Sequence, residues 1–595
     1  MTKQDLLRVF AVSTAAISGL LLGASIASAQ GIAFDGFPGS IPKAVCAPTD
    51  RAESGLQGET TEQERFSGDS ENGYNCNLQL VGEEPQDTYQ GAYSQDGPAY
   101  YDVCAYYGTD SGANTNQGIK VIDVSDPAHP QVAAHLTDSP AALNPHETVH
   151  TNANTRILVA GQNGGQNFAV YDISDCRHPV LKSSITLPGS NGHMGAFAQD
   201  GKTYYLSQNP CCSGFGGPLY IIDTSDPSNA KMLPTWNFAG NGRPHSLNVN
   251  PQGFAGLAVG TRAYMNQGRS WPFADAPDGL VITDVSDYQF RRPNPQIRIV
   301  STLFYPDQGT GESTIPVTIN GHPYIVSVDE AGAASASDGW PGACARGFGA
   351  FGYPQIIDVA DETHPKIIAK IRMQVADPAN CAALRAETPP DIPGTAPGTN
   401  LPAISGTTNY SVEACVADNP DDTKMLACGA QNAGLRVFDV SDPTHPKEIA
   451  YWKSGAVRTR ILPSSGSWDA RMVNGQGIDR TVDKIAHWPR WVVVRKGNGQ
   501  GNGNGNGNGN GNGNGNSQGN NGNGQGNANG NGQGNGNGNG NGNGNGVGGG
   551  PGNSADIQLW TVSDAHGFQV LQFSKSFTAQ HKDLFANTVT TQQDR

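Results

Sequence analysis

The sequence predicts an all-β protein, a seven-bladed β-propeller of four-stranded antiparallel blades. The main observation is the segment VIDVSDPAHPQVAAHL at 121–136, which recurs with drift at 170–187, 220–236, 281–303, 356–371, 437–452 and 559–573. A hairpin pattern precedes it, as in GAYSQDGPAYYDVC at 91–104 and GAFAQDGKTYYLS at 195–207, where an Asp-Gly turn (Asp96-Gly97 in the first) separates an alternating apolar run from a Tyr-rich run. Single units of this kind cannot bury both faces, and radial stacking of seven units solves that.

Each repeat ends in a specific turn. In the first copy the third strand covers 119–124, a tight turn follows at 125–127, and a fourth strand begins after His129-Pro130. Asp126 can accept hydrogen bonds from backbone amides ahead of it, and Pro127 presets φ for the first central turn position. The Asp-His pair is therefore predicted to build a turn rather than an active site. The same holds for the equivalent histidines, which are expected to pack in turns and not to bind ligands: His129, His178, His364 and His445.

The repeats place the blades at approximately 88–137, 146–188, 193–238, 245–304, 312–373, 411–453 and 468–575. The signature resembles the LVIVD repeat family, β-propeller modules of exported or cell-surface proteins, over most of 88–575. That resemblance implies the fold and an extracellular setting, and it implies no defined biochemical role. The turns of blades four (VSDYQFRRPNP) and seven (VSDAHGF) depart from the pattern. The first blade looks complete, so the ring is expected to close without strand exchange between the termini.

The segments outside the repeats indicate export. Lys3 and Arg8, the apolar run 9–26 and the Ala27-Ser28-Ala29 site predict a signal peptide over 1–29. No later segment approaches the ~20 apolar residues of a membrane span. Residues 30–87 are predicted to be an irregular N-terminal extension and 576–595 a C-terminal tail.

The ten cysteines all follow the signal peptide, and an even number in an exported chain favours disulfides. Cys415 and Cys428 flank the turn DNPDD and could be cross-strand neighbours, whereas the partners of Cys211 and Cys212 stay open. The net charge of −16 without a basic stripe argues against nucleic acid as a partner. Residues 497–554, almost purely Gly-Asn, cannot offset their ordering entropy and are predicted to form a disordered insert in blade seven. For this tract, an insertion without a function, tolerated because loop closure costs grow slowly with length, is favoured over a self-associating tether for matrix or partner contact.

Functional residues of a propeller concentrate on loops held by the scaffold. The face that joins strand two to three, and one blade to the next, carries long loops at 208–218, 262–279, 330–353, 372–410 and 497–554. Counting back from the first hairpin turn, the residues that open the inner strands are predicted to be Tyr89, His146, His193, His245, Ser313 beside Glu312, and Glu413.

Three successive blades would thus point histidine toward the axis, with Glu147, Glu312 and Glu413 nearby. Imidazoles with a carboxylate suit Zn, Cu or Fe, and selenium-binding-type propellers offer an architectural analogy. The candidate ligands are His146, His193, His245 and Glu413; the alternative is that a repeat reuses a good packing residue, and that alternative is favoured.

Polar pairs also recur at the end of strand two, on the same face. They include Asn266-Gln267 and Asp329-Glu330, and the candidate ligand-binding residues among them are Gln162, Asn163, Gln208, Asn209, Gln431 and Asn432. They could hydrogen-bond a ligand or satisfy the loop backbone, and the second role is favoured.

The sequence favours binding over catalysis. It contains no GxSxG, no HExxH and no phosphate-binding loop, and His146-Glu147 with His150 has the wrong spacing for a metalloprotease helix. The predicted function is an exported module that binds an envelope or extracellular protein or glycan through its loop-rich face. The alternative is a metal-dependent oxidoreductase or hydrolase with a histidine cluster at the channel mouth.

Overall fold

The computed structural model describes most of the chain outside the predicted signal peptide and the Gly-Asn tract. The described residues are 35–85, 94–109, 117–145, 147–189, 192–207, 218–237, 244–267, 278–309, 311–335, 339–387, 409–459, 479–481, 489–494, 556–563 and 566–590. The chain divides into two compact units, 1–493 with 557–595, and 494–556. The propeller belongs to the first unit.

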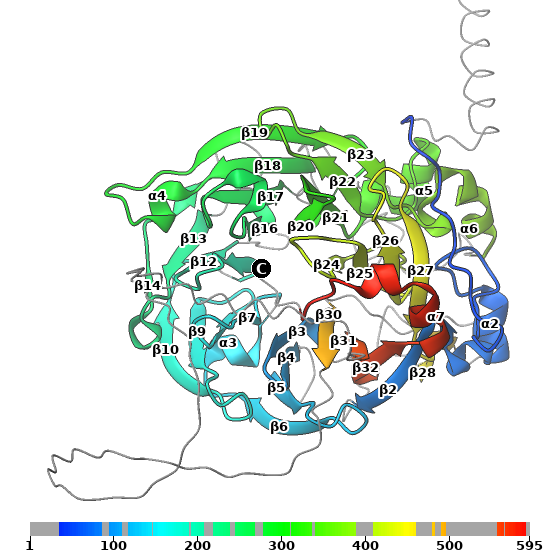
Figure 1. The fold of residues 1–595 in the computed structure, drawn as a ribbon, viewed down its shortest axis with the longest axis horizontal. Helices are drawn as coiled ribbons and strands as arrows, with labels where there is room; N and C mark the ends of the chain where they lie inside the picture. The colour runs from blue at the N-terminus through cyan, green and yellow to red at the C-terminus, as the bar shows by residue number, and fades with distance from the viewer. Residues whose placement is uncertain are drawn as a thin grey trace, which may run out of the picture. The chain divides into compact units, whose positions relative to one another are not determined.

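Seven antiparallel sheets stand round a ring, which confirms the predicted seven-bladed β-propeller, and Figure 1 shows β3, β7, β16, β20, β24 and β30 toward its centre. From inside to outside, blade one is β3 (Ser94–Tyr101), β4 (Cys104–Thr109), β5 (Gly118–Asp123) and β6 (Gln131–Leu136). Blade two is β7 (His150–Asn152), β8 (Ile157–Gly161), β9 (Asn167–Asp172) and β10 (Val180–Thr186). Blade three is β11 (Gly195–Phe197), β12 (Thr203–Leu206) and β13 (Pro218–Asp223), with β14 (Lys231–Met232) and β15 (Trp236–Asn237) both pairing β13.

The remaining blades follow the same order. Blade four is β16 (Pro244–Val249), β17 (Arg262–Gln267), β18 (Asp278–Asp284) and β19 (Arg298–Tyr305), and blade five is β20 (Gly311–Ile319), β21 (His322–Asp329), β22 (Gln355–Asp358) and β23 (Lys366–Lys370). Blade six is β24 (Ala414–Ala417), β25 (Met425–Gly429), β26 (Leu435–Asp439) and β27 (Lys447–Lys453), and blade seven contains β30 (Arg490–Val494), β31 (Asp556–Ser563) and β32 (Gly567–Phe573). A separate two-stranded sheet joins β28 (Val457–Thr459) and β29 (Asp479–Thr481).

Helices are short and lie in the segments that connect or flank the strands. They are α2 (Glu62–Ser67), η1 (Asp69–Asn72), α3 (Pro140–Leu143), η2 (Pro227–Asn229), η3 (Phe254–Gly256), α4 (Ser286–Gln289), η4 (Gly332–Ser335), α5 (Gly339–Ala345), η5 (Gln374–Ala376), η6 (Pro378–Asn380), α6 (Cys381–Glu387), α7 (Lys575–Gln580) and α8 (Lys582–Phe585). Within the described part of the chain, no helix has the length and apolar character to cross a membrane.

The ring closes by strand exchange, so the expectation of closure without it is wrong. Strand β2 (Leu78–Glu84), from the N-terminal side, pairs with β32 and forms the outer strand of blade seven. Strand β1 (Tyr74–Cys76) pairs with β27 as a fifth strand on blade six. The extension before blade one is therefore irregular only in its first part, and its later part supplies two strands. Because an outer strand left unpaired would expose its backbone groups, the N-terminal strands also cover two sheet edges.

The first hairpin of blade one differs from its prediction. The Asp96-Gly97 pair, expected to be the turn, lies inside β3, and the chain turns at Asp102, whose φ is 56°. The pairing of β3 with β4 is irregular on both sides of Asp96, which absorbs the turn-like sequence within the strand. Tyr89, predicted to open this inner strand, lies outside the described residues.

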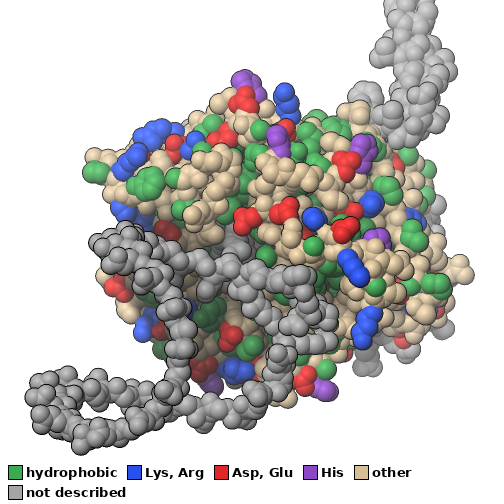
Figure 2. All heavy atoms as spheres, in the orientation of Figure 1, with side chains coloured by type: hydrophobic (Ala, Val, Ile, Leu, Met, Phe, Trp, Pro, Cys, Tyr) green, Lys and Arg blue, Asp and Glu red, His purple; other side chains and the backbone are tan. Residues whose placement is uncertain are grey.

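The signature turns behave as predicted. Asp126 Oδ1 accepts a hydrogen bond from the Ala128 amide at 3.1 Å, and Asp126 Oδ2 lies 2.9 Å from His129 Nδ1. The same Asp–His contact recurs at 3.0 Å in the pairs 175/178, 361/364 and 442/445. These histidines are exposed, and Figure 2 shows histidine beside acidic side chains at several points of the visible face. They stabilise turns on the outside of the blades.

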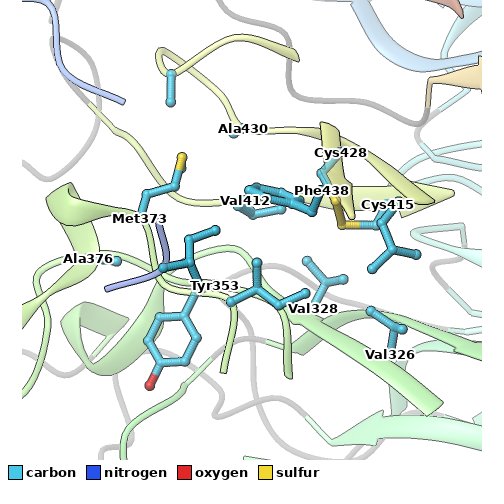
Figure 3. Close-up of a cluster of buried hydrophobic side chains, with 14 of the residues drawn as sticks. Val326, Val328, Tyr353, Met373, Ala376, Val412, Cys415, Cys428, Ala430 and Phe438 are labelled. Carbon is cyan, nitrogen blue, oxygen red and sulfur yellow. A yellow bond between two sulfur atoms is a disulfide. The ribbon is translucent and has the colours of Figure 1, made fainter. Parts of the chain in front are cut away.

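Apolar clusters fill the space between adjacent blades. Figure 3 shows the one between blades five and six, where Val326 and Val328 lie near Val412 and Phe438. Because neighbouring blades pack on each other in this way, side chains at the start of one inner strand lie close to those of the next.

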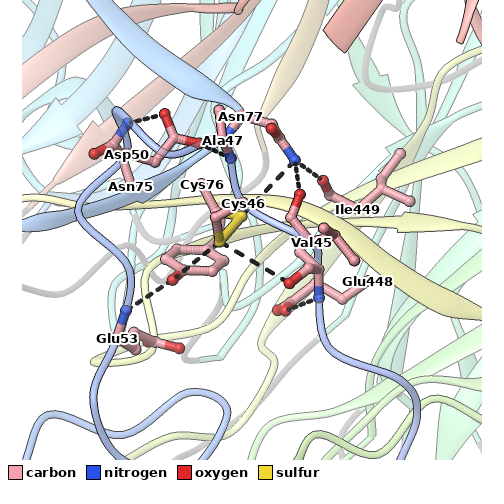
Figure 4. Close-up of a disulfide and its surroundings, with 12 residues drawn as sticks. Val45, Cys46, Ala47, Asp50, Glu53, Asn75, Cys76, Asn77, Glu448 and Ile449 are labelled. Carbon is pink, nitrogen blue, oxygen red and sulfur yellow. Dashed lines mark hydrogen bonds between the residues drawn. A yellow bond between two sulfur atoms is a disulfide. The ribbon is translucent and has the colours of Figure 1, made fainter. Parts of the chain in front are cut away.

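Four disulfides join the described cysteines: Cys46–Cys76, Cys104–Cys176, Cys344–Cys381 and Cys415–Cys428. The last confirms the predicted cross-strand pair, since Cys415 and Cys428 are partners in the β24–β25 register. Figure 4 shows the first, beside which Asn77 donates to the carbonyls of Val45 and Ile449. The disulfide and these hydrogen bonds tie the N-terminal extension to blade six.

A candidate metal centre where the inner strands begin

One structural position recurs at the start of the inner strand in five successive blades. In each blade a residue near the start of the inner strand is paired with the end of strand two, as register or hydrogen bonds show: Thr148 with Gly161, Met194 with Ser207, Ser246 with Asn266, Ser313 with Val328, and Ala414 with Gly429. The residue directly before it is Glu147, His193, His245, Glu312 and Glu413, respectively. Blades two to six thus each present one ionisable side chain at the same position.

Local irregularity turns several of these residues out of the regular ladder. The register of β16 slips between Pro244 and Ser246, so His245 is the extra residue, and that of β20 slips between Gly311 and Ser313 at Glu312. Glu147 has a φ of 51°, in the left-handed region that non-glycine residues seldom adopt. A bulge re-aims its side chain, which is why bulges are frequent beside functional sites.

The side chains from four of these blades meet. His193 Nε2 lies 2.8 Å from His245 Nε2 and 3.4 Å from Glu147 Oε2. On the other side of its ring, His245 Nδ1 lies 3.1 Å from Glu312 Oε2. Glu330, which follows β21, places Oε1 at 4.0 Å from His245 Nε2. Ligand atoms of His245, Glu312 and Glu330 fall within 4.8 Å of one another.

The cluster is largely removed from solvent. The side chains of Glu147 and Glu312 are 4% and 0% exposed, while Glu330 is 29% exposed. Burial raises the pKa of Glu147 well above its ordinary value, and the charges of Glu312, Glu413 and Glu330 raise it further. Burial likewise raises the pKa of Glu312, with added repulsion from Glu330 and Glu413. Such a group of acids holds protons or a cation, since like charges this close cannot all ionise alone.

The geometry suits a single metal ion between the two imidazoles. Because Glu312 faces Nδ1 of His245, a proton on Nδ1 leaves Nε2 as the lone-pair donor. Zinc–nitrogen bonds of about 2.0–2.1 Å place two tetrahedral ligand atoms roughly 3.3 Å apart. The separations of 2.8 and 3.4 Å around His193 Nε2 lie on either side of that spacing. His193 Nε2 therefore has a nitrogen donor and a carboxylate oxygen beside it, while His245 is grouped with Glu312 and with Glu330 at the more exposed side.

The predicted ligands are only partly placed by the structure. His193 and His245 lie together, and Glu413 holds the equivalent position in blade six. His146 lies outside the described residues, and the pairing of Thr148 with Gly161 assigns the blade-two position to Glu147 instead. In blade five the position belongs to Glu312 and not to Ser313. In blades two and five the site residue thus lies one position from the predicted one, because the sequence gives no sign of the local backbone irregularities. The sequence pattern groups Glu330 with the strand-two polar pairs and gives no sign of its approach to His245.

The polar pairs at the end of strand two mostly contact loop backbone. Gln162 Oε1 accepts from the Gln166 amide at 3.2 Å, and Asn432 Oδ1 accepts from the Asn409 amide at 2.8 Å. The Asn163 backbone pairs with Asn144, while Gln431 has a φ of 37° in a turn. Gln208 and Asn209 lie outside the described residues.

Comparison with known proteins agrees with the repeat architecture. The chain contains LVIVD repeats, with matches to the repeat's family model at 113–138 and 427–452. A search of curated proteins gave no match.

Similar solved structures include the Cps50 (Swd1) β-propeller domain of Myceliophteria thermophila, with 9% identity over 68% of this chain and 92% of that one and a TM-score of 0.36. Sqt1 from Chaetomium thermophilum has 14% identity over 60% and 72% of the two chains, with a TM-score of 0.35. A protein from Lactobacillus plantarum has 12% identity over 58% and 81%, with a TM-score of 0.35.

Proposed function

We propose that this protein is an exported β-propeller that binds one divalent transition-metal ion where its inner strands begin. The observation that carries the proposal is the approach of His193 Nε2 to His245 Nε2 at 2.8 Å beside Oε2 of Glu147 at 3.4 Å. Imidazole and carboxylate donors of this kind suit Zn, Cu or Fe.

The charge of the site supports a cation as its ligand. Glu147, Glu312, Glu330 and Glu413 bring four carboxyl groups to two imidazoles, and the first two are almost fully buried. Ionising them together in a low dielectric is unfavourable unless a positive charge lies among them. A divalent ion would displace protons from these acids and convert their repulsion into coordination.

If the bound metal also supports a reaction, the protein is a metal-dependent enzyme. A bound transition-metal ion can act as a Lewis acid or lower the pKa of a bound water. Glu330 is the solvent-side carboxylate of the cluster, so the position next to it is where a substrate or water would approach.

Export rests on the predicted signal peptide at 1–29 and is supported by the four disulfides, which form and persist in oxidising compartments.

A second candidate function is binding of an envelope or extracellular protein or glycan through the loop-rich face. Its support is the Cys344–Cys381 disulfide, which joins α5 in the loop 330–353 to α6 in the loop 372–410. A covalent bond between two loops restricts their relative movement, so that they can form one continuous binding surface. Pull-down from envelope extract should lose its partners when both loops are shortened, and unchanged capture would contradict this face as the binding surface.

Elemental analysis tests the metal proposal. The full chain, purified from its native compartment, is expected to carry about one equivalent of metal. The double variant His193→Ala/His245→Ala should lose it. The matched control is His129→Ala/His178→Ala, which removes two exposed turn histidines and should retain it. Protein that neither carries metal nor binds added Zn, Cu or Fe would refute the proposal.

A further inference from the structure

Ser207 touches the backbone beside both site histidines. It follows β12 directly and is fully buried. Its Oγ lies 2.6 Å from the carbonyl oxygen of His245 and 2.9 Å from that of Met194, the residue after His193. The Met194 amide also donates to Ser207 Oγ at 3.2 Å. One hydroxyl thus bridges the inner strands of blades three and four at the point where each carries its histidine.

Asn266 makes the corresponding bridge from blade four to blade five. It pairs with Ser246 in the β16–β17 register, as Ser207 pairs with Met194 in blade three. Its Nδ2 donates to the Ser313 carbonyl at 2.9 Å and lies 3.4 Å from that of Val328. Its Oδ1 accepts from Ser327 Oγ at 3.0 Å.

The residues that Asn266 contacts lie next to carboxylates of the site. Ser313 follows Glu312, and Val328 lies two residues before Glu330. The two strands approach each other closely here, as shown by Gly311: a Cβ added to it would lie 2.6 Å from Asn266 Cβ. One side chain of the preceding blade, Asn266, therefore holds the backbone beside both Glu312 and Glu330.

We propose that Ser207 and Asn266 are positioning residues of the metal centre, which set the spacing between site residues of neighbouring blades. Ser207 fixes the distance between the backbones of His193 and His245. Asn266 fixes the distance from the backbone of His245 to those of Glu312 and Glu330. This inference rests on the proposed metal-binding function. The physical reason is that ligand atoms must be held within about 0.5 Å of their working positions, so a residue that fixes the interval between two blades affects the metal more than the fold.

The chain offers a matched control for Ser207 in the same blade. Thr224 is also fully buried, and its Oγ1 donates to the Gly201 carbonyl at 2.8 Å in the β11–β12 turn, at the opposite end of the strands. Thr224→Val and Ser207→Ala each remove one buried hydroxyl. A merely structural role predicts equal consequences for both.

The test measures zinc affinity and the cobalt(II) d–d absorption spectrum of the full chain. Ser207→Ala is expected to bind zinc about 10–100-fold more weakly, as for outer-shell changes at metal sites, with an altered cobalt spectrum. Ser207→Thr, which keeps the hydroxyl, should restore both readouts, and Thr224→Val should leave them unchanged. Zinc affinity within twofold of wild type together with an unchanged spectrum in Ser207→Ala would overturn the inference and leave the metal site intact.

If the wild type binds no metal, a crystal structure of Ser207→Ala still tests the positioning role of Ser207 separately from the metal-binding function. The His193–His245 Nε2 separation is expected to change by more than about 0.5 Å, the tolerance of a preorganised site. An unchanged separation would overturn the positioning role, whereas absence of metal from the wild type would overturn only the proposed function.

Discussion

His193 and His245 lie 52 residues apart in the chain and belong to neighbouring blades, yet their Nε2 atoms are 2.8 Å apart. Their rings cross at 64° with centroids 4.4 Å apart. The two imidazoles thus make an edge-to-face contact with their Nε2 atoms adjacent, which requires both inner strands to begin at the same level of the ring.

Glu312→Gln should weaken metal binding without abolishing it. Glu312 Oε2 faces His245 Nδ1 at 3.1 Å, on the ring nitrogen turned away from His193. If it orients the imidazole from outside the coordination sphere, its amide analogue should lose about 10–100-fold in zinc affinity. Competition titration against a chromogenic chelator measures this, with His245→Ala as the reference for full loss. Loss as complete as that of His245→Ala would identify Glu312 as a direct ligand.

Gly82→Ala should destabilise the ring closure. A Cβ at Gly82 would lie 2.4 Å from the Pro127 carbonyl oxygen and 2.6 Å from that of Ala128, in the signature turn of blade one. Both obstacles are backbone, so the cost should be about 1–3 kcal/mol, as for overpacking elsewhere. Thermal unfolding of the two proteins gives the difference. Leu80→Ala, on the same strand but 39% exposed, should change stability far less. Equal effects of the two substitutions would argue against close packing of β2 on blade one.

Unreduced protein should contain at most two free thiols. Eight of the ten cysteines form the four disulfides, and Cys211 and Cys212 lie outside the described residues. Peptide mapping by mass spectrometry should recover the Cys104–Cys176 peptide pair, which links blade one to blade two. Replacing both by serine should lower the free energy of unfolding by about 2–4 kcal/mol. Recovery of Cys104 linked to any other cysteine would contradict the connectivity.

Asp35→Asn should destabilise the protein at neutral pH and lose that effect in acid. Burial alone would raise the pKa of Asp35, but Arg372 and Lys370, the latter at 2.5 Å, hold it down to about 2. A carboxyl group with a depressed pKa stabilises the fold above its unfolded value near 3.8, and that stabilisation disappears as the pH falls through about 2.

After allowance for partial solvent screening, the contribution of Asp35 is on the order of 1 kcal/mol. Urea unfolding of wild type and Asp35→Asn at pH 7, 4 and 2.5 should show the difference shrinking only below pH 4. A difference independent of pH would mean that charge pairing of Asp35 does not contribute. Asp69→Asn, an exposed partner of Arg51, serves as the surface control.

The sequence by itself determined the blades. Their signature recurs seven times, and the turn residues Asp126 and Pro127 impose local geometry that needs no distant partner. The same local chemistry predicted that His129 and its equivalents serve turns, and that Cys415 and Cys428 face each other across a hairpin. Each of these features is decided within about twenty residues of chain, so a repeated pattern reveals it.

Tertiary structure decided which residues meet at the centre. The bulges at His245 and Glu312, and the left-handed backbone of Glu147, set where these side chains lie, and no local sequence pattern records them. The pairing of β2 with β32 joins segments almost 490 residues apart, and Glu330 reaches His245 only because blade five packs beside blade four. Histidine at two blades was visible in the sequence; the acids that complete the site depend on the closed ring.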